Sequence, residues 1–147
     1  TLQAILEETG IEPGRLKLEI TESVVMAVDD AFTLLDRLRK IGISLALDDF
    51  GTGYSSLSYL KMLPVQQLKI DRSFVIGIGQ NPEDEAIIRS VMALAQSLNF
   101  EVVAEGVETA EQAAFLSASG CHQLQGFLHG SAVAPAEFRA RWSSLPR

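Results

Sequence analysis

The 147-residue sequence has few of the features that secreted and membrane-spanning proteins need. Its single cysteine, Cys121, excludes an internal disulfide bond and is compatible with a reducing cytoplasm. No apolar run approaches the roughly 20 residues of a membrane-spanning helix, and no cleavable signal pattern opens the chain. We therefore expect a cytoplasmic protein and no membrane contact from this segment.

Positive charge is also scarce. Lysine and arginine number 12 against 19 aspartates and glutamates, which gives a net charge of -7. Proteins that bind DNA or RNA polymers hold them largely through basic side chains, so we expect no such partner. An anionic ligand would need metal ions or local cations. The two histidines, His122 and His129, do not stand at the spacing of a zinc site.

Hydrophobic residues make up 47% of the chain, enough for the core of one domain. Short β-rich runs, expected to be strands, lie at residues 16–20, 43–47, 67–70, 101–104 and 122–125. Helical patterns lie between and after them, at about residues 30–41, from 82 onwards, and at about 55–62, 110–118 and 135–142. Because parallel neighbours need a crossover connection, this alternation predicts an α/β protein with a parallel sheet. The pattern leaves both an open doubly wound sheet and a barrel possible, although no strand precedes a G-x-G-x-x-G turn.

Polar residues fall at or just past the C-terminal ends of these strands. They are Glu19 and Glu22, Asp48 and Asp49, Lys69 and Asp71, Glu105 and Glu108, and Gln125. Ligands bind at this end of a parallel α/β sheet, so several carboxylates are expected to converge there. A hard divalent cation, Mg²⁺ or Mn²⁺, would compensate their charge through oxygen ligands. Any one of these residues taken alone is equally well explained as a helix cap or a solvated loop residue.

The stretch "SLALDDFGTGYSSL", residues 44–57, contains two adjacent aspartates. On a regular strand Asp48 and Asp49 would point to opposite faces, so both can serve one site only where the chain leaves the strand. Gly51 and Gly53 are expected to provide that exit. A carboxylate between two cations would suit a two-metal site about 3.5 to 4 Å across. The letters "DFG" also occur in protein kinases, but no H-R-D loop accompanies them here.

Lys69 has several possible roles. It can pair with Asp71, or it can hold a nucleophile or a phosphate oxygen at the mouth of a barrel. A third possibility is the Schiff-base amine of a barrel lyase or aldolase.

Four segments resemble a known family: "LEITES" at residues 18–23, "DDFGTGYSSLSYLKMLPVQQLKIDRSF" at 48–74, "VVAEGVET" at 102–109 and "QGF" at 125–127. In this order and spacing they are similar to the EAL-domain phosphodiesterases of cyclic di-GMP. The resemblance implies a partial TIM-like (β/α) barrel of about five parallel strand-helix units, with residues 1–147 as a single partial EAL domain. It also implies hydrolysis of cyclic di-GMP to linear pGpG with two Mg²⁺ or Mn²⁺ ions.

The resemblance assigns roles residue by residue. The implied metal ligands are Glu19, Asp48, Asp49 and Glu105, with Asp48 bridging the two ions. Lys69 would orient the attacking water or the phosphate, and Gln125 would support the site. Glu108 would either support the metal ligands or take part in the metal site itself. Glu22 would stabilise the glycine-rich loop that contains Gly51, Thr52 and Gly53, which the family links to dimerisation.

The sequence also departs from the family. The E-A-L signature with its metal-binding Glu, the following Arg and an early Asn ligand are missing, so one metal would lose two ligands. Ala132 and Ala134 stand where prolines are expected. We expect either a homodimer or completion by the missing N-terminal strands. The alternative function is a truncated or non-catalytic module for cyclic di-GMP binding or dimerisation.

Overall fold

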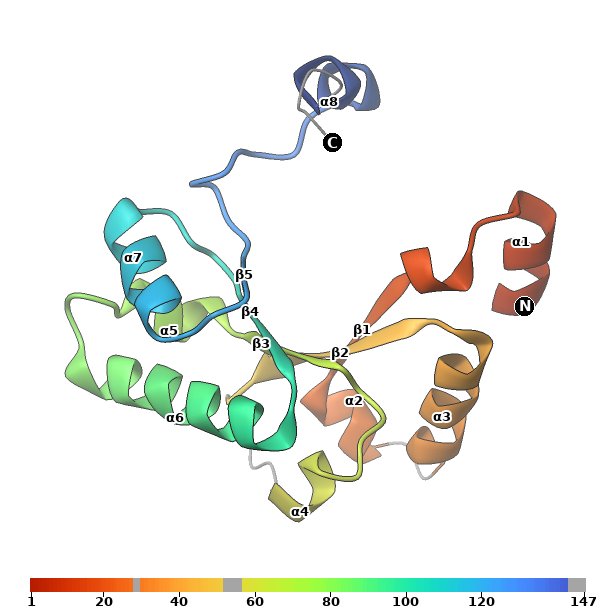
Figure 1. Ribbon diagram of the computed structural model, residues 1–147, viewed down its shortest axis with the longest axis horizontal. Coiled ribbons are helices and arrows are strands. Elements are labelled where there is room, and N and C mark those ends of the chain that lie inside the picture. The colour runs from red at the N-terminus through yellow and green to blue at the C-terminus, as the bar shows by residue number, and fades with distance from the viewer. Residues whose placement is uncertain (28–29, 52–56, 143–147) are drawn as a thin grey trace.

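The computed structural model describes residues 1–27, 30–51 and 57–142. Its five strands are β1 (Lys17–Thr21), β2 (Ser44–Phe50), β3 (Gln67–Ile70), β4 (Glu101–Ala104) and β5 (Gln123–Leu124). They form one sheet in the order β1-β2-β3-β4-β5, and every neighbouring pair is parallel (Figure 1). The expected parallel α/β arrangement is therefore confirmed.

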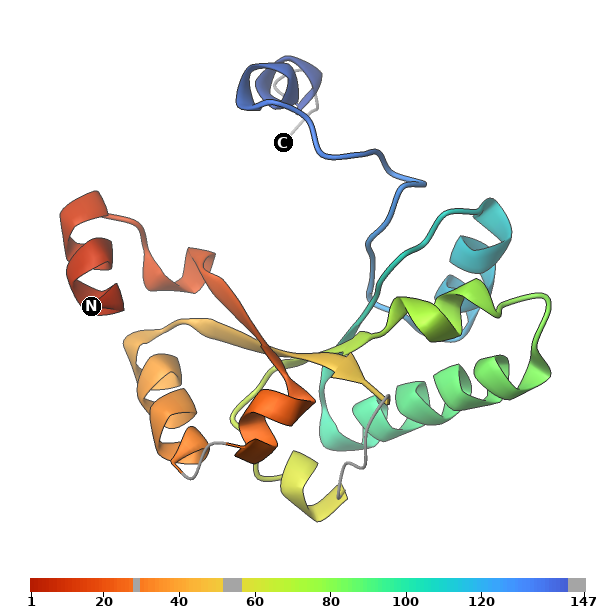
Figure 2. The same ribbon diagram turned by 180° about the vertical axis from the view of Figure 1, so that it is seen from behind.

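Helices alternate with the strands. They are α1 (Leu2–Thr9), α2 (Glu22–Ala27), α3 (Ala31–Ile41), α4 (Leu57–Leu60), α5 (Arg72–Ile76), α6 (Pro82–Leu98), α7 (Ala110–Ala118) and α8 (Pro135–Trp142), with a 3₁₀ turn η1 (Pro13–Arg15). Figures 1 and 2 show α3, α4 and α6 on one side of the curved sheet, whereas α1 and α8 stand apart on the other side.

Local sequence signals predicted the ends of several of these elements. Helix α6 begins after Asn81, whose side chain accepts a hydrogen bond from the Glu83 amide, and α3 ends at Gly42 in the left-handed conformation. Strand β2 is longer than expected, because it continues through both aspartates to Phe50. Helices α2 and α5 were not expected, since each is one or two turns long and starts directly after a strand.

The two faces of the sheet differ in polarity. Side chains alternate along each strand, so one face carries buried apolar residues that pack in the core against the helices. They are Leu45, Leu47, Leu68, Ile70, Val102 and Ala104. The opposite face carries mostly polar side chains, among them Gln67 and Lys69, together with the apolar Ala46 and Val103. The interior of a TIM barrel is more commonly filled by bulky apolar residues.

A layer of hydrogen bonds crosses the polar face near the N-terminal ends of the strands. Gln67, 3% exposed, accepts from Lys17 Nζ at 2.9 Å and donates to Glu101 Oε2 at 3.3 Å. Gln123 Nε2 also reaches Glu101 Oε2, at 3.5 Å. These contacts join β1, β3, β4 and β5 below the strand ends at which the expected site residues lie.

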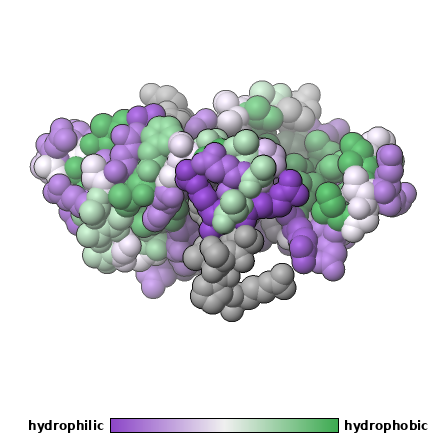
Figure 3. Space-filling model, turned by 90° about the horizontal axis from the view of Figure 1, so that it is seen from above, coloured by the Kyte–Doolittle hydropathy of each residue, from purple (hydrophilic) through white to green (hydrophobic). Residues whose placement is uncertain are grey.

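The outer surface is mixed in polarity. Seen from above, hydrophobic residues form separate groups among hydrophilic ones (Figure 3). Within the described ranges, no helix has the length and apolar character to cross a membrane.

Candidate functional site

Lys69 is the centre of the polar cluster at the strand ends. This β3 side chain is 2% exposed, and its Nζ lies 2.6 Å from Glu19 Oε2, 3.1 Å from Asp48 Oδ1 and 2.5 Å from Glu105 Oε1. Glu19 is on β1, Asp48 is on β2 and Glu105 directly follows β4. The parallel register brings these positions together, because Glu19, Asp48 and Lys69 lie on one face of neighbouring strands and Glu105 comes directly after the next strand. Four of the expected site residues are thus in contact.

The cluster carries an excess of negative charge, since three carboxylates surround one ammonium group. Burial lowers the pKa of Lys69, but the hydrogen bonds that its ammonium donates to Glu105, Glu19 and Asp48 outweigh that effect, and the pKa is raised above its ordinary value. Lys69 therefore stays cationic in this arrangement. A Schiff-base enzyme needs an uncharged amine, so the geometry disfavours the lyase or aldolase alternative.

A β-bulge places the two adjacent aspartates. From Leu47 to Phe50 strand β2 advances three positions while β3 advances two, from Leu68 to Ile70, so β2 carries one extra residue. Asp49 has a φ of 54°, a left-handed conformation that is uncommon outside glycine. Strand β2 ends at Phe50, directly before Gly51, so the chain leaves the strand at this glycine as expected. The two aspartates, however, lie inside the strand, where the bulge at Asp49 breaks the alternation of side chains.

The donor set suits a hard cation in its chemistry. Glu19, Asp48 and Glu105 offer carboxylate oxygens, the ligands that Mg²⁺ and Mn²⁺ prefer. In the part of the chain that the structure describes, however, no three His, Cys, Asp or Glu side chains are arranged to hold a metal ion. The reason is that the three carboxylates turn toward the Lys69 ammonium, and they would have to turn away from it to bind a cation.

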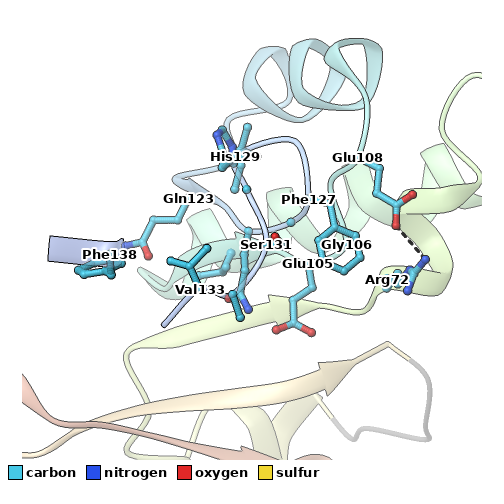
Figure 4. Close-up of a pocket in the computed structure, with 16 residues that line it drawn as sticks. Arg72, Glu105, Gly106, Glu108, Gln123, Phe127, His129, Ser131, Val133 and Phe138 are labelled. Carbon is cyan, nitrogen blue, oxygen red and sulfur yellow. Dashed lines mark hydrogen bonds and ion pairs between the residues drawn. The ribbon is translucent and has the colours of Figure 1, made fainter. Parts of the chain in front are cut away.

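A pocket of about 770 Å³ adjoins this cluster. Its lining includes Arg72, Glu105, Glu108 and Phe127, which Figure 4 labels. Gln125 also lines it, and all five residues lie at or after the ends of β3, β4 and β5. Glu105 contacts Lys69 and also lines the pocket, so the cluster and the pocket form one continuous site.

Gly126 holds the end of β5 against the segment after β4. The Val107 amide donates to the Gln125 carbonyl at 3.0 Å, and the Leu128 amide donates to the Val107 carbonyl at 3.0 Å. A Cβ on Gly126 would lie 2.1 Å from that Val107 oxygen, so no other residue fits there without movement. This close approach puts Gln125 and Phe127 on the pocket wall.

Other expected site residues lie outside the cluster. Glu22 begins α2, and its Oε2 is buried without a hydrogen-bond partner among the described residues. Thr52 and Gly53, in the loop that Glu22 was expected to hold, lie outside the described residues. Gly51 has a φ of 99°, a conformation that favours glycine.

Asp71 is a helix cap. Its side chain accepts from the Ser73 amide at 3.0 Å and from the Ser73 hydroxyl at 2.5 Å, at the start of α5. These hydrogen bonds lower the pKa of Asp71 against the opposing effect of burial. The strand-end pattern therefore included one residue whose role is structural.

Arg72 and Phe127 were not singled out from the sequence as site residues. Arg72 Nη2 lies 2.8 Å from Glu108 Oε1 at the rim of the pocket. The sequence feature that could have indicated them is a glycine close to each residue. Gly106 lies against the Arg72 side chain in the fold, and Gly126 directly precedes Phe127.

The structure is that of an α/β protein with a parallel sheet and a cluster of carboxylates at the C-terminal ends of its strands. Residues 1–132 match the EAL domain family, and the chain belongs to this family. EAL domains are TIM-like barrels, so the expected partial TIM-like (β/α) barrel with about five parallel strand-helix units is confirmed.

The chain is similar to named relatives and to solved structures of EAL proteins. "Cyclic di-GMP phosphodiesterase NbdA" of Pseudomonas aeruginosa is 49% identical over 124 residues, which are 84% of this chain and 16% of that protein. The solved c-di-GMP complex of the PaMucR phosphodiesterase has a TM-score of 0.89 at 43% identity, covering 93% of this chain and 56% of that one. The manganese and cyclic di-GMP complex of Klebsiella pneumoniae BlrP1 has a TM-score of 0.78 at 39% identity, covering 86% and 33%. The chain thus spans only part of the length of each relative.

Proposed function

We propose that residues 1–147 form a partial EAL domain whose site hydrolyses cyclic di-GMP to linear pGpG. The convergence of Glu19, Asp48 and Glu105 on Lys69, beside a pocket large enough for a nucleotide, carries this proposal. Relatives named as cyclic di-GMP phosphodiesterases, and a solved complex with this ligand, support it.

Four acidic residues would hold the divalent cations. They are Glu19, Asp48, Asp49 and Glu105, with Mg²⁺ or Mn²⁺ as the ions, and the manganese-containing complex of a family member supports this choice. When bound, such cations supply charge neutralisation for a phosphodiester and activation of water near neutral pH.

The proposed reaction is hydrolysis of one phosphodiester bond, in which Lys69, Gln125 and Glu108 would contact the nucleotide. Water attacks the phosphorus in line, the P–O3′ bond breaks, and the leaving oxygen takes up a proton. Lys69, kept cationic by its carboxylate neighbours, would stabilise the negative charge on the phosphate oxygens or orient the water. Gln125 and Glu108 line the pocket that would receive the nucleotide.

Completion of the barrel is part of the proposal. In the described sheet, β1 and β5 each have one neighbouring strand, so both present an open edge. Either N-terminal strands of the same EAL domain or a second copy in a homodimer would cover these edges, in a cytoplasmic protein.

A second candidate is a non-catalytic module that binds cyclic di-GMP or mediates dimerisation. The position of Lys69 favours it, because the ammonium holds the three carboxylates that the cations would need.

Turnover and binding distinguish the two candidates. The purified chain is incubated with cyclic di-GMP and Mn²⁺ or Mg²⁺, and the products are separated by chromatography beside an Asp48→Asn control. Appearance of pGpG with the parent chain alone supports catalysis. Binding without any pGpG supports the non-catalytic module, and neither binding nor turnover contradicts both.

A further inference from the structure

Arg72 and Glu108 form an ion pair on the rim of the pocket. The Nη2 to Oε1 distance is 2.8 Å, and the side chains are 54% and 40% exposed, so both keep polar atoms open to a ligand (Figure 4). The pair comes from two elements, since Arg72 starts α5 and Glu108 follows β4.

Gly106 fixes the path of the Arg72 side chain. A Cβ on Gly106 would lie 2.3 Å from Arg72 Cγ, so the arginine crosses directly over this backbone. Gly106 also has a φ of 69°, which favours glycine by itself. The backbone after β4 thus leaves room for the arginine and supplies its carboxylate partner two residues later.

Phe127 adds an aromatic surface to the same pocket. Its side chain is 68% exposed although it lines the cavity, and the hydrogen bonds around Gly126 hold its backbone in place. In Figure 4 its ring is drawn between Glu105 and the Arg72–Glu108 pair. An exposed aromatic ring inside a nucleotide-sized pocket is suited to stacking with a base.

The pair suits the edge of a base better than a phosphate. Glu108 already neutralises Arg72, so the pair offers little net positive charge to an anion. It offers instead guanidinium donors beside carboxylate acceptors. Guanine has the complementary edge, with the O6 acceptor next to the N1–H and N2–H donors.

We propose that Arg72 and Glu108 recognise the Watson–Crick edge of one guanine that stacks on Phe127. Arg72 donates to O6, and Glu108 accepts from N1–H and the N2 amino group. In the same orientation adenine would present an amino donor to the arginine, so the pair selects guanine. This assignment rests on the proposed function, because it takes cyclic di-GMP as the ligand.

The test compares cyclic di-GMP with cyclic di-IMP, in which each base lacks the N2 amino group. Dissociation constants are measured by titration calorimetry with the 147-residue chain in the presence of Ca²⁺. The parent chain should bind cyclic di-GMP roughly 5- to 150-fold more tightly, the discrimination typical of one well-placed polar contact to a base. Glu108→Met should bring the ratio close to one, and Arg72→Met should weaken binding of both nucleotides.

Glu12→Met is the matched control, because it removes the carboxylate of an exposed Glu12–Arg15 pair outside the pocket. It should keep the parental ratio, and circular dichroism verifies that every variant is folded. Equal binding of both nucleotides by the parent chain, or a parental ratio in Glu108→Met, overturns the assignment and leaves the proposed function standing. No binding of cyclic di-GMP by the parent chain overturns both.

Discussion

Lys69 Nζ lies 2.5 Å from Glu105 Oε1, and this ion pair connects the buried cluster at the strand ends with the open pocket beside it. Glu105 is the shared residue, since it contacts the ammonium and also lines the cavity. A change at Lys69 is therefore expected to affect both the stability of the fold and the shape of this pocket.

Lys69→Met should destabilise the protein and make it dependent on divalent cations. Removing one member of a buried ion pair typically costs about 3–5 kcal/mol, and we expect about 2–3 kcal/mol here because the carboxylates are partly exposed. Mg²⁺ or Mn²⁺ should restore part of the loss by binding the carboxylates that are left unpaired. Urea unfolding with and without the cation measures both effects.

Lys40→Met is the control for that experiment, because Lys40 pairs with Asp36 on the exposed surface of α3. It should cost less than about 1 kcal/mol and show no response to the cation. An equal loss in both variants would contradict the role assigned to the Lys69 cluster.

Gly126→Ala should displace Gln125 and Phe127 from the pocket. The added methyl group would meet the Val107 carbonyl oxygen, a backbone atom that cannot move without disturbing the segment after β4. We expect a loss of about 1–3 kcal/mol in the free energy of unfolding and a weaker affinity for cyclic di-GMP. At Gly14 the nearest atom would be 3.8 Å away, so Gly14→Ala should change neither quantity appreciably.

Asp71→Ala should lower stability more at neutral pH than in strong acid. The folded-state pKa of Asp71 lies below its ordinary value of 3.8, because Ser73 donates to the carboxylate. Because this pKa is lower in the folded state, the ionised Asp71 stabilises the fold fully above pH 3.8. The stabilisation is lost as the pH falls through the folded-state pKa. The variant should therefore be about 1 kcal/mol less stable than the parent at pH 7, with a smaller gap below pH 3.8. A gap that grows on acidification would contradict this account.

Gln67→Leu should show that the layer of hydrogen bonds near the N-terminal ends of the strands contributes to stability. The substitution leaves Lys17 and Glu101 without their buried amide partner, which we expect to cost about 1–3 kcal/mol. Gln3→Leu removes an exposed side chain that reaches only Glu7 within its own helix, and should be nearly neutral. Equal midpoints of urea unfolding in the two variants would rule out a structural role for this layer.

Local signals in the sequence were sufficient for much of the fold. The bounds of β3 and β4 were expected as the structure has them, because β-rich runs there stand between clear helical patterns. The caps at Asn81 and Gly42 likewise set the ends of α6 and α3. The meeting of Glu19, Asp48 and Glu105 followed from the same reasoning, since strand-end carboxylates in a parallel sheet share one edge.

What the sequence did not reveal depends on contacts between distant segments. The bulge at Asp49 arises from the register between β2 and β3, which no local pattern specifies. The three-carboxylate environment of Lys69 requires side chains from three strands and from the residue after β4 to be placed together. Arg72 becomes a pocket residue only because Gly106, far along the chain, leaves space beneath it.

The most direct test of the central claim is anomalous X-ray diffraction from crystals of the chain grown with Mn²⁺ and cyclic di-GMP. We predict manganese peaks among Glu19, Asp48, Asp49 and Glu105, with these carboxylates turned away from Lys69 and toward the metal. The nucleotide should lie in the pocket beside Glu105. If the carboxylates still pair with Lys69 and no manganese peak lies among them, the proposed metal-dependent site is contradicted.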